Sequence, residues 1–355
     1  MPEVLPAFIA SVVRPFDFNH DGYQELFIGS RVKKGKFPYA NPSWLIFNDK
    51  GKLSVSSSSS LDLGMVTDAV WTDYDNDGWE DLFVVREWDS PVILKNMKGK
   101  ELIAQTIPDL DIQHGLWYSV VAADFDLDGD DDYMLGNLGE NNQFSVSREY
   151  PLILYALDFE MDGILDPFMT AFWKDKNGKM KEYPVNNLDE LKEQSSFFET
   201  RFKDYTSFSY AGTNDILDEN MMKRVEFKLH VNTTASCILW NENGKFRMEK
   251  LPRSLQVSPV KKMMVQDLNK DKYPDVVVAG NDYTWDVSNG YFDALKGMVL
   301  INRGKDRSFD ILPPSESGLL LQGMVESLLW FDGDTSLIVA GINRGGAVVF
   351  EHNNR

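Results

Sequence analysis

The chain has 355 residues, of which 43% are hydrophobic and 12% aromatic, so it is long and apolar enough to bury a large core. A formal net charge of −19 argues against nucleic acid as a partner, because a phosphate backbone would be repelled. No apolar run reaches the roughly 18 residues that a membrane span needs. Cys237 is the single cysteine, which excludes a disulfide within the chain and a cysteine-based metal site.

Short segments rich in β-branched residues follow one another from the N-terminus and predict strands joined by turns. The first group lies at 8–14, 26–30, 44–48 and 53–56. The second lies at 68–71, 82–85, 92–96 and 99–102, and a third begins at 118–121. A four-stranded unit that recurs in this way is typical of a β-propeller blade, whereas helical solenoids lack the alternating strands.

The strand pattern stops between residues 174 and 230, where Asn187 predicts the capped start of a helix and 216–223 a second short helix. We expect this stretch to be an insertion packed on the propeller, too short and too charged to bury a core of its own. Strands return at 225–229, 237–241, 262–265, 276–280, 298–302, 327–331 and 337–341. The prediction is a single all-β domain over 1–355. It is a β-propeller of four-stranded blades, six in this chain with seven as the alternative, and it carries a partly helical insertion at 174–230.

One nine-residue loop organises the chain, and its clearest copy runs from Asp124 to Asp132. Acidic side chains stand at loop positions 1, 3, 5 and 9, and glycine stands at position 6. Alternate positions of a tight loop point inward, and Gly129 permits a left-handed turn that a Cβ atom would resist. Oxygen ligands at this spacing suit calcium, which takes about six to eight oxygens at roughly 2.3–2.6 Å and tolerates irregular geometry.

Further copies of the loop begin at residues 17, 73, 158 and 267, so the pattern predicts up to five calcium ions. The expected ligands are the side chains at positions 1, 3, 5 and 9 and the backbone carbonyl at position 7. They are Asp17, Asn19, Asp21, Tyr23 and Glu25; Asp73, Asp75, Asp77, Trp79 and Asp81; Asp124, Asp126, Asp128, Asp130 and Asp132; Asp158, Glu160, Asp162, Ile164 and Asp166; and Asp267, Asn269, Asp271, Tyr273 and Asp275.

The copies differ from one another at positions that matter for binding. Lys272 replaces the glycine of the loop that begins at Asp267, where a residue with a Cβ atom costs about 1 kcal/mol or more. This site is therefore expected to bind most weakly. Asn19 and Asn269 supply neutral oxygens and lower the ligand charge, and Glu160 is longer than the usual aspartate. In the last blade the loop has shrunk too far to hold a metal ion.

The loop at Asp158 follows the loop at Asp124 too closely to open a regular repeat. Either it occupies the outer hairpin of the third blade, with strands at 152–155 and 168–171, or it opens a fourth blade. Both placements keep the predicted count of six blades.

The D-x-D/N-x-D-G-x-x-D loops between strands resemble the FG-GAP or VCBS repeats of integrin α-subunit propellers. Several further segments are similar to bacterial secreted proteins related to cartilage acidic protein, although the sequence shows no ASPIC segment. These segments lie at 135–142, 151–155, 181–184, 279–281 and 290–294. The resemblance implies an extracellular or surface-anchored calcium-binding propeller, usually within a longer polypeptide, and it implies no defined activity.

The remaining candidate residues give weaker evidence of function than the acidic loops do. The histidines have no partner at metal-ligand spacing; they are His20, His114, His230 and His352. Neither a nucleophile elbow nor a phosphate-binding glycine loop is present. A group of aromatic residues, several of which fall outside the strands, can stack on sugar rings or anchor a protein partner, although packing of long loops is the favoured interpretation. They are Trp117, Trp173, Tyr183, Tyr283, Trp285, Tyr291 and Phe292.

Two functions remain open at this point. The favoured hypothesis is a non-catalytic binding or scaffold module, in which calcium rigidifies the blades and the opposite face recognises a protein or a glycan. The alternative is a calcium-dependent, polysaccharide-active enzyme of the propeller lyase kind, which needs an open coordination position and a nearby base that the sequence does not reveal.

The calcium loops also bear on localisation. Calcium loops of extracellular modules bind at about 10⁻⁴–10⁻³ M. We therefore expect an extracellular, cell-surface or periplasmic protein whose leader is not present in this chain. Further domains of a longer polypeptide are part of the same expectation.

Overall fold

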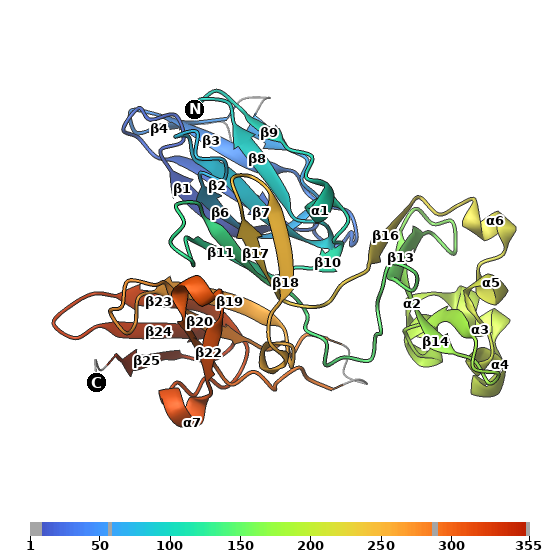
Figure 1. Ribbon diagram of the computed structural model, residues 1–355. Coiled ribbons are helices and arrows are strands. Elements are labelled where there is room, and N and C mark those ends of the chain that lie inside the picture. The colour runs from blue at the N-terminus through green and yellow to red at the C-terminus, as the bar shows by residue number, and fades with distance from the viewer. Residues whose placement is uncertain (1–8, 56–58, 286–289, 353–355) are drawn as a thin grey trace.

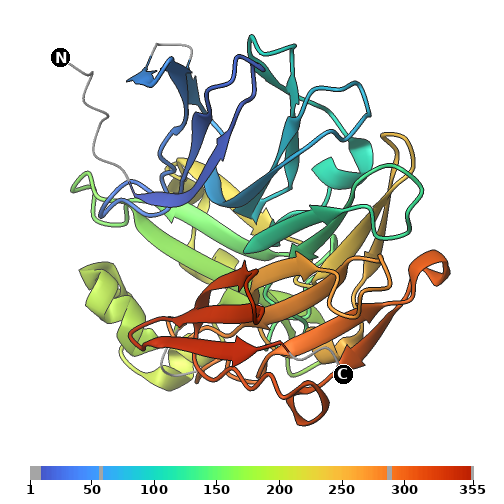
Figure 2. The ribbon, with the colours of Figure 1, turned by 90° about the vertical axis from the view of Figure 1, so that its left-hand side faces the viewer.

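The computed structural model describes residues 9–55, 59–285 and 290–352, and within these ranges the strands form six antiparallel sheets. Figure 1 shows two parts, a stack of sheets and a smaller lobe that carries most of the helices. In Figure 2 the blue first sheet and the red last sheet lie at opposite ends of the view. No helix in the described ranges is long and apolar enough to cross a membrane.

The sheets of the N-terminal half follow the chain. The first contains β1 (Ala10–Phe16), β2 (Glu25–Ser30), β3 (Ser43–Asp49), β4 (Lys52–Ser54) and the short β5 (Ser60–Leu61). The second contains β6 (Met65–Thr72), β7 (Asp81–Asp89), β8 (Val92–Asn96), β9 (Leu102–Ala104) and β10 (Gly115–Leu116), with α1 (Pro108–Asp111) before β10. The third contains β11 (Ser119–Ala123), β12 (Asp132–Gly136), β17 (Cys237–Asn241) and β18 (Phe246–Lys250).

The remaining sheets include one that interrupts the third. This inserted sheet contains β13 (Leu152–Leu157), β14 (Asp166–Lys174), β15 (Met180–Pro184) and β16 (Phe227–Val231). Its helices are α2 (Leu188–Gln194), α3 (Ser196–Arg201), α4 (Tyr205–Ser209), α5 (Thr213–Ile216) and α6 (Glu219–Met222). The last two sheets contain β19 (Val260–Gln266), β20 (Asp275–Gly280), β21 (Met298–Asn302) and β22 (Phe309–Leu312), then β23 (Val325–Phe331), β24 (Leu337–Ile342) and β25 (Ala347–Glu351). Short helical turns η2 (Arg253–Leu255), η4 (Gly304–Asp306) and α7 (Pro314–Ser317) lie between these strands.

The first strands of five sheets are neighbours in chain order, because β6 contacts β1 and β11, and β19 contacts β11 and β23. The later strands of each sheet pair outward from this first strand. Inner strands side by side, each followed by an antiparallel sheet, are the arrangement of propeller blades. The predicted all-β, propeller-like fold is therefore confirmed. The count of six blades is not confirmed, because five sheets follow this order and the sixth belongs to the insertion.

The insertion runs between β12 and β17, so it extends beyond the predicted 174–230 segment and includes a sheet as well as the helices. The loop that begins at Asp158 joins β13 to β14 in this sheet. The outer hairpin of the third sheet is instead formed by β17 and β18, which is not the placement expected for 152–155 and 168–171. Strand alternation alone did not separate the insertion from the blades, since its strands have the same period.

The inserted lobe buries a core of its own, contrary to the expectation from its charge. Phe159, Phe168 and Phe198 pack with ring centroids 4.9, 5.8 and 6.1 Å apart. Leu188 and Asn187 begin α2 as predicted, with Leu188 fully buried and the Asn187 side chain accepting a backbone N–H of the first turn. Each short helix contributes few apolar side chains, but the sheet beneath supplies the rest of the core.

The other face of the inserted sheet packs on the stack. Leu152 and Val231 join an apolar cluster with Met65 and Leu116 of the second sheet. Met65 begins β6, and the acidic loop follows the other end of that strand. The inserted lobe therefore lies against the end of the second sheet that is opposite its acidic loop.

Candidate metal centres

The acidic loops of the stack lie on one face of the molecule. Each joins the first strand of a sheet to the second; these loops begin at Asp17, Asp73, Asp124 and Asp267. The Nδ2 atom of Asn76 donates to the carbonyl of Gly129, in the next loop, at 3.2 Å. The ring of His20 is stacked on Trp79 with centroids 4.4 Å apart. The first three loops are thus direct neighbours.

All five loops share one backbone conformation, which the aspartate at position 1 holds. In the loop that begins at Asp73, one carboxylate oxygen accepts the N–H of Asp77 at 3.0 Å and the other accepts that of Gly78 at 2.8 Å. The same pair of hydrogen bonds recurs in the other four loops. Position 6 is left-handed throughout, including Lys272 with a φ of 78°. The predicted turn is therefore present in every copy.

The acid at position 9 ties the loop to the third strand of its sheet. Asp81 is fully buried, and its Oδ1 atom accepts the backbone N–H of Asn96 at 2.6 Å. The Asn96 amide donates in turn to the carbonyl of Phe18, in the loop of the preceding sheet, at 2.9 Å. Asn241 and Asn302 repeat both bonds in the next two sheets of the stack. The loop pattern does not include these asparagines, although each stands shortly before a turn glycine.

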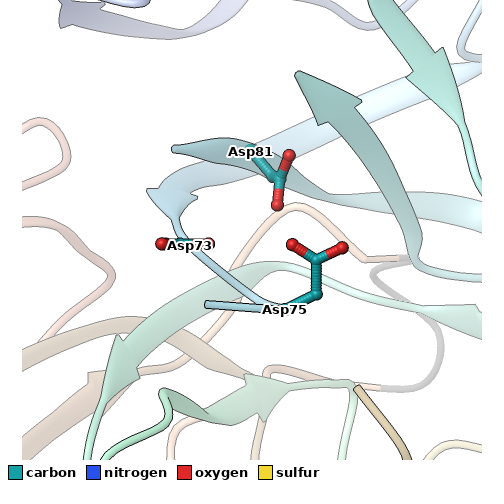
Figure 3. A group of neighbouring side chains, drawn as sticks. All are labelled: Asp73, Asp75 and Asp81. Carbon is teal, nitrogen blue, oxygen red and sulfur yellow. The ribbon is translucent and has the colours of Figure 1, made fainter. Parts of the chain in front are cut away.

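Three carboxylates converge in the loop of the second sheet. One oxygen each of Asp73, Asp75 and Asp81 lies within 4.8 Å of the other two, and Figure 3 shows these side chains around a common space. The Oδ1 atom of Asp75 and the Oδ2 atom of Asp81 are buried and accept no hydrogen bond from the described residues. Burial raises the pKa of Asp81 to about 7. Since buried oxygens without donors are costly, this loop has the donor set of a cation site.

The loop of the third sheet is built in the same way. One oxygen each of Asp124, Asp126 and Asp128 lies within 4.8 Å of the other two. Asp126 is buried, and its Oδ1 atom has no hydrogen-bond partner within the described ranges. Burial raises the pKa of Asp132, the closing acid, to about 7. In the part of the chain that the structure describes, only these two loops bring three potential ligand atoms within 4.8 Å of one another.

We call these two groups of converging carboxylates, in the loops at Asp73 and Asp124, cages. A basic side chain lies beside each cage. Lys95, on β8, pairs with Asp75 and, at 2.9 Å, with Asp77. Arg307, which follows η4, contacts the Oδ2 atom of Asp126 at 2.6 Å. Both cations contact Oδ2 atoms, whereas the buried Oδ1 atoms of Asp75 and Asp126 have no hydrogen-bond partner among the described residues. Neither contact could be predicted from a sequence pattern, because strand pairing and sheet packing bring these residues together.

The loop of the inserted sheet has the turn without the cage. The Oε1 atom of Glu160 accepts the backbone N–H of Ser196 at 2.8 Å, so the position-3 side chain turns toward α3. The Ser196 hydroxyl donates to the same oxygen, and these hydrogen bonds, first that of the hydroxyl and then that of the backbone N–H, lower the pKa of Glu160. The predicted ligands Asp158, Glu160 and Asp162 are therefore not brought together as their equivalents are in the second and third sheets.

Neutral amides change the first and last loops of the stack. The Nδ2 atom of Asn19 donates to Glu25 at 3.3 Å, and that of Asn269 donates to Asp271 at 2.9 Å. An amide donor near a carboxylate satisfies charge that a metal ion would otherwise neutralise. The carboxylates of these loops do not gather as closely as those at Asp73 within the described residues.

The structure also separates the aromatic candidates. Trp117 is fully buried in the core between the second and third sheets. Tyr283 and Tyr291 are 39% and 62% exposed, with ring centroids 5.0 Å apart. Trp173 and Tyr183 lie on β14 and β15 of the inserted sheet and so are not outside the strands. Trp173 packs against the same apolar cluster as the partly buried Trp285 and Phe292. The histidines His114 and His230 lie ring to ring at 4.1 Å.

Comparison with protein families agrees with the loop pattern. Residues 17–84 and 73–135 match the FG-GAP-like repeat. The matched ranges begin at the first two acidic loops, so the predicted resemblance to FG-GAP repeats is confirmed over residues 17–135. The comparison with curated proteins finds no match.

Several solved structures are similar over nearly the whole chain. The V. cholerae biofilm matrix protein Bap1 is 9% identical, with 100% of this chain and 70% of that chain covered and a TM-score of 0.35. An Agrocybe aegerita lectin that recognises non-reducing terminal N-acetylglucosamine is 10% identical, with 98% and 81% covered and a TM-score of 0.29. BBS1N, solved in complex with ARL6DN, is 9% identical, with 98% and 93% covered and a TM-score of 0.27.

Proposed function

We propose that the protein is a non-catalytic, calcium-binding module that acts outside the cytoplasm and binds a protein or glycan partner. The observation that carries the proposal is the convergence of Asp73, Asp75 and Asp81 around buried oxygens that lack hydrogen-bond donors. The group at Asp124 and Asp126 repeats it in the next sheet. Two neighbouring sites of the same design are stronger support than one acidic cluster.

Calcium fits these donor sets better than a transition metal does. The converging ligands are all carboxylate oxygens, whereas zinc and copper sites use cysteine or histidine ligands. Calcium also accepts an irregular shell that includes backbone carbonyls. In the second sheet Asp73, Asp75, Asp77 and Asp81 would hold the ion, with the carbonyl of Trp79. In the third sheet the corresponding residues are Asp124, Asp126, Asp128, Asp130 and Asp132. We include the loops at Asp17, Asp158 and Asp267 as weaker sites, to a total of up to five ions.

The ion would act on stability and shape. A bound cation would neutralise carboxylates that repel one another and fix the turn between the first two strands. Asp81 is already bonded to the third strand through Asn96, which reaches the preceding loop. Rigidity imposed at one loop would therefore extend across two sheets of the stack.

An enzymatic role receives less support. A calcium-dependent lyase needs a base beside an open coordination position. The basic side chains at the two cages, Lys95 and Arg307, are already paired with cage carboxylates. We therefore favour a binding module, and a net charge of −19 disfavours nucleic acid as its partner.

Calcium titration of the metal-free protein tests the proposal. Isothermal calorimetry of the parent is expected to show at least two ions bound per chain, and the variant Asp75→Asn is expected to lose one. Asp109→Asn, in α1, is a control that leaves the stoichiometry unchanged. An absence of calcium binding at millimolar concentration would contradict the proposal.

A further inference from the structure

A pocket of about 350 Å³ opens between the loop after β12 and the loop that joins β20 to β21. Aromatic rings and side-chain amides line much of it: Phe144, Trp285, Tyr291, Phe292, Asn141 and Gln143. The volume is at the lower end of the roughly 300–1,000 Å³ found for ligand pockets. Neither the acidic loops nor the metal proposal uses these residues.

The aromatic side of the pocket is fixed in place. Trp285 lies 6.1 Å from Phe144 and 5.6 Å from Phe292 between ring centroids. Phe292 is held by two backbone hydrogen bonds to Asp282, at 2.8 and 3.0 Å, which clasp the base of the loop. Tyr291 is 62% exposed at the pocket, where a ligand can cover its ring.

The polar side of the pocket is also preorganised. The backbone N–H of Asn141 donates to the carbonyl of Gln256 at 2.9 Å, and its Nδ2 atom donates to that of Val257 at 3.1 Å. The Oδ1 atom of Asn141 accepts no hydrogen bond from the described residues, nor does the Gln143 side chain form one with them. Asp293 adds an exposed carboxylate. Asn141 is therefore held in place, and together these groups offer both donors and acceptors to a ligand.

We infer that this pocket binds a short neutral saccharide. The apolar C–H face of a pyranose ring stacks on an exposed aromatic ring, here Tyr291, while its hydroxyl groups pair with amides and a carboxylate. No lysine, arginine or histidine is among the residues that line the pocket in the described ranges, although Lys296 forms an ion pair with Asp293 at 4.0 Å. The chemistry therefore selects a neutral sugar over a uronate, a sulfate or a phosphate.

A peptide ligand fits this pocket less well. An apolar peptide anchor needs a largely apolar hole, whereas amides and a carboxylate form one wall here. This inference rests on the proposed binding function and names the class of its ligand as a glycan. The pocket residues and the calcium ligands are separate sets, so each proposal can fail alone.

The test uses an array of neutral, uronate-containing and sulfated glycans, with ligand-observed NMR of the matching neutral methyl glycosides. The parent is expected to bind at least one neutral glycan. Tyr291→Ala should weaken that binding by about tenfold or more, as for an aromatic residue central to an interface. Tyr291→Phe keeps the ring and should stay close to the parent. Tyr210→Ala removes an equally exposed tyrosine of the inserted lobe and should change nothing.

Three results would overturn the inference: binding to anionic glycans alone, binding unaffected by Tyr291→Ala, or binding of a peptide library with no neutral glycan bound. Calcium stoichiometry measured on the same variants separates this inference from the proposed function. If the parent holds calcium and captures a protein but no glycan, the pocket assignment fails while the calcium-binding module stands.

Discussion

The loops of the third sheet and of the inserted sheet have the same signature but different side-chain geometry. Asp124 and Asp158 both accept the backbone N–H groups of loop positions 5 and 6, so the turns match, and Asp158 accepts two further N–H groups of its loop. At position 3, however, Asp126 is buried in a group of three carboxylates, while Glu160 reaches out to Ser196 on a neighbouring helix. Both loops form the turn, but only the loop at Asp124 brings its carboxylates together.

The difference lies in what surrounds each loop. Asp132 closes the third-sheet loop, and its Oδ1 atom accepts the N–H of Asn241, whose amide reaches the loop of the preceding sheet. Asp166 closes the inserted loop, is only partly buried, and bonds within its own loop through the N–H of Phe159 at 3.0 Å. The signature determines the turn, and packing between sheets determines whether the carboxylates converge.

Removal of calcium should have the largest effect. Each saturated site stabilises the native state by about 2.7 kcal/mol at one hundred times Kd, and without the ion the carboxylates repel one another. Excess EGTA is therefore expected to lower the melting temperature by many degrees, as followed by circular dichroism. Readdition of calcium should restore it, whereas magnesium at the same concentration should do so less well. Identical melting curves with and without EGTA would refute a structural role for calcium.

Substitution of the position-1 aspartate compares the two kinds of loop directly. Asp124→Ala should remove one bound ion and about 2.7 kcal/mol of stability at one hundred times Kd. Asp158→Ala and Asp267→Ala should remove less, because their carboxylates do not gather in the same way. Calorimetric stoichiometry and chemical denaturation in saturating calcium measure both effects. Equal losses of bound calcium and of stability in all three variants would show that the cage at Asp124 binds calcium no better than the loops at Asp158 and Asp267.

The metal-free protein should lose stability as the pH rises. Burial raises the pKa of Asp81 and Asp132 from 3.8 to about 7 in the folded chain. Protonation of these groups therefore stabilises the fold below the unfolded value, and this contribution is lost as the pH rises through about 7. Protein dialysed free of divalent cations should melt at a higher temperature at pH 5 than at pH 8. With calcium the order should reverse, because binding requires ionised carboxylates.

Conversion of the inserted loop toward a cage sharpens the comparison. Glu160→Asp shortens the side chain beyond the reach of Ser196 and restores the usual residue at position 3. If the contact with α3 is what keeps this carboxylate away, the variant should bind calcium at this loop more tightly than the parent. Ser196→Ala removes the hydroxyl that donates to Glu160 but keeps the backbone N–H that also does so, and it should therefore change affinity less. If Glu160→Asp brings no gain in calcium affinity, the longer side chain is not what prevents the cage. The cause would then be that Asp166 bonds within its own loop, whereas Asp132 also accepts the N–H of Asn241.

The smallest effect is expected at Lys272, which adopts the left-handed backbone with a φ of 78°. Lys272→Gly removes strain of about 1 kcal/mol, part of which is offset by the greater freedom of glycine in the unfolded chain. The reverse change, Gly129→Ala, has open space for its Cβ atom and should destabilise through the backbone alone. Urea denaturation of both variants gives the two values. The account would be contradicted if Lys272→Gly destabilised the protein.

Patterns among residues close together in the chain were sufficient to predict the turns. The spacing of Asp124, Gly129 and Asp132 predicted a left-handed loop between two strands, and the hydrogen bonds and φ angles agree. Repetition of strands and loops likewise predicted an all-β, propeller-like fold. These features depend on residues close together in the chain, which a sequence displays directly.

Contacts between segments that are far apart in the chain could not be predicted from such local patterns. Asn241 bonds Tyr74 across 167 residues, and Arg307 contacts Asp126 across 181. The insertion was misjudged for a related reason, since its strands alternate like those of a blade and only pairing shows that β17 returns to β12. Whether Glu160 faces its loop or a helix is likewise decided by tertiary packing.

The count of calcium ions in the parent and in the double variant Asp73→Ala/Asp124→Ala tests the central claim most directly. Native mass spectrometry of the folded proteins, titrated with calcium after removal of divalent cations, gives that count. We predict that the double variant binds two ions fewer than the parent, and that each single variant binds one fewer. The same number of ions in parent and double variant would contradict the account, because calcium would then be held elsewhere.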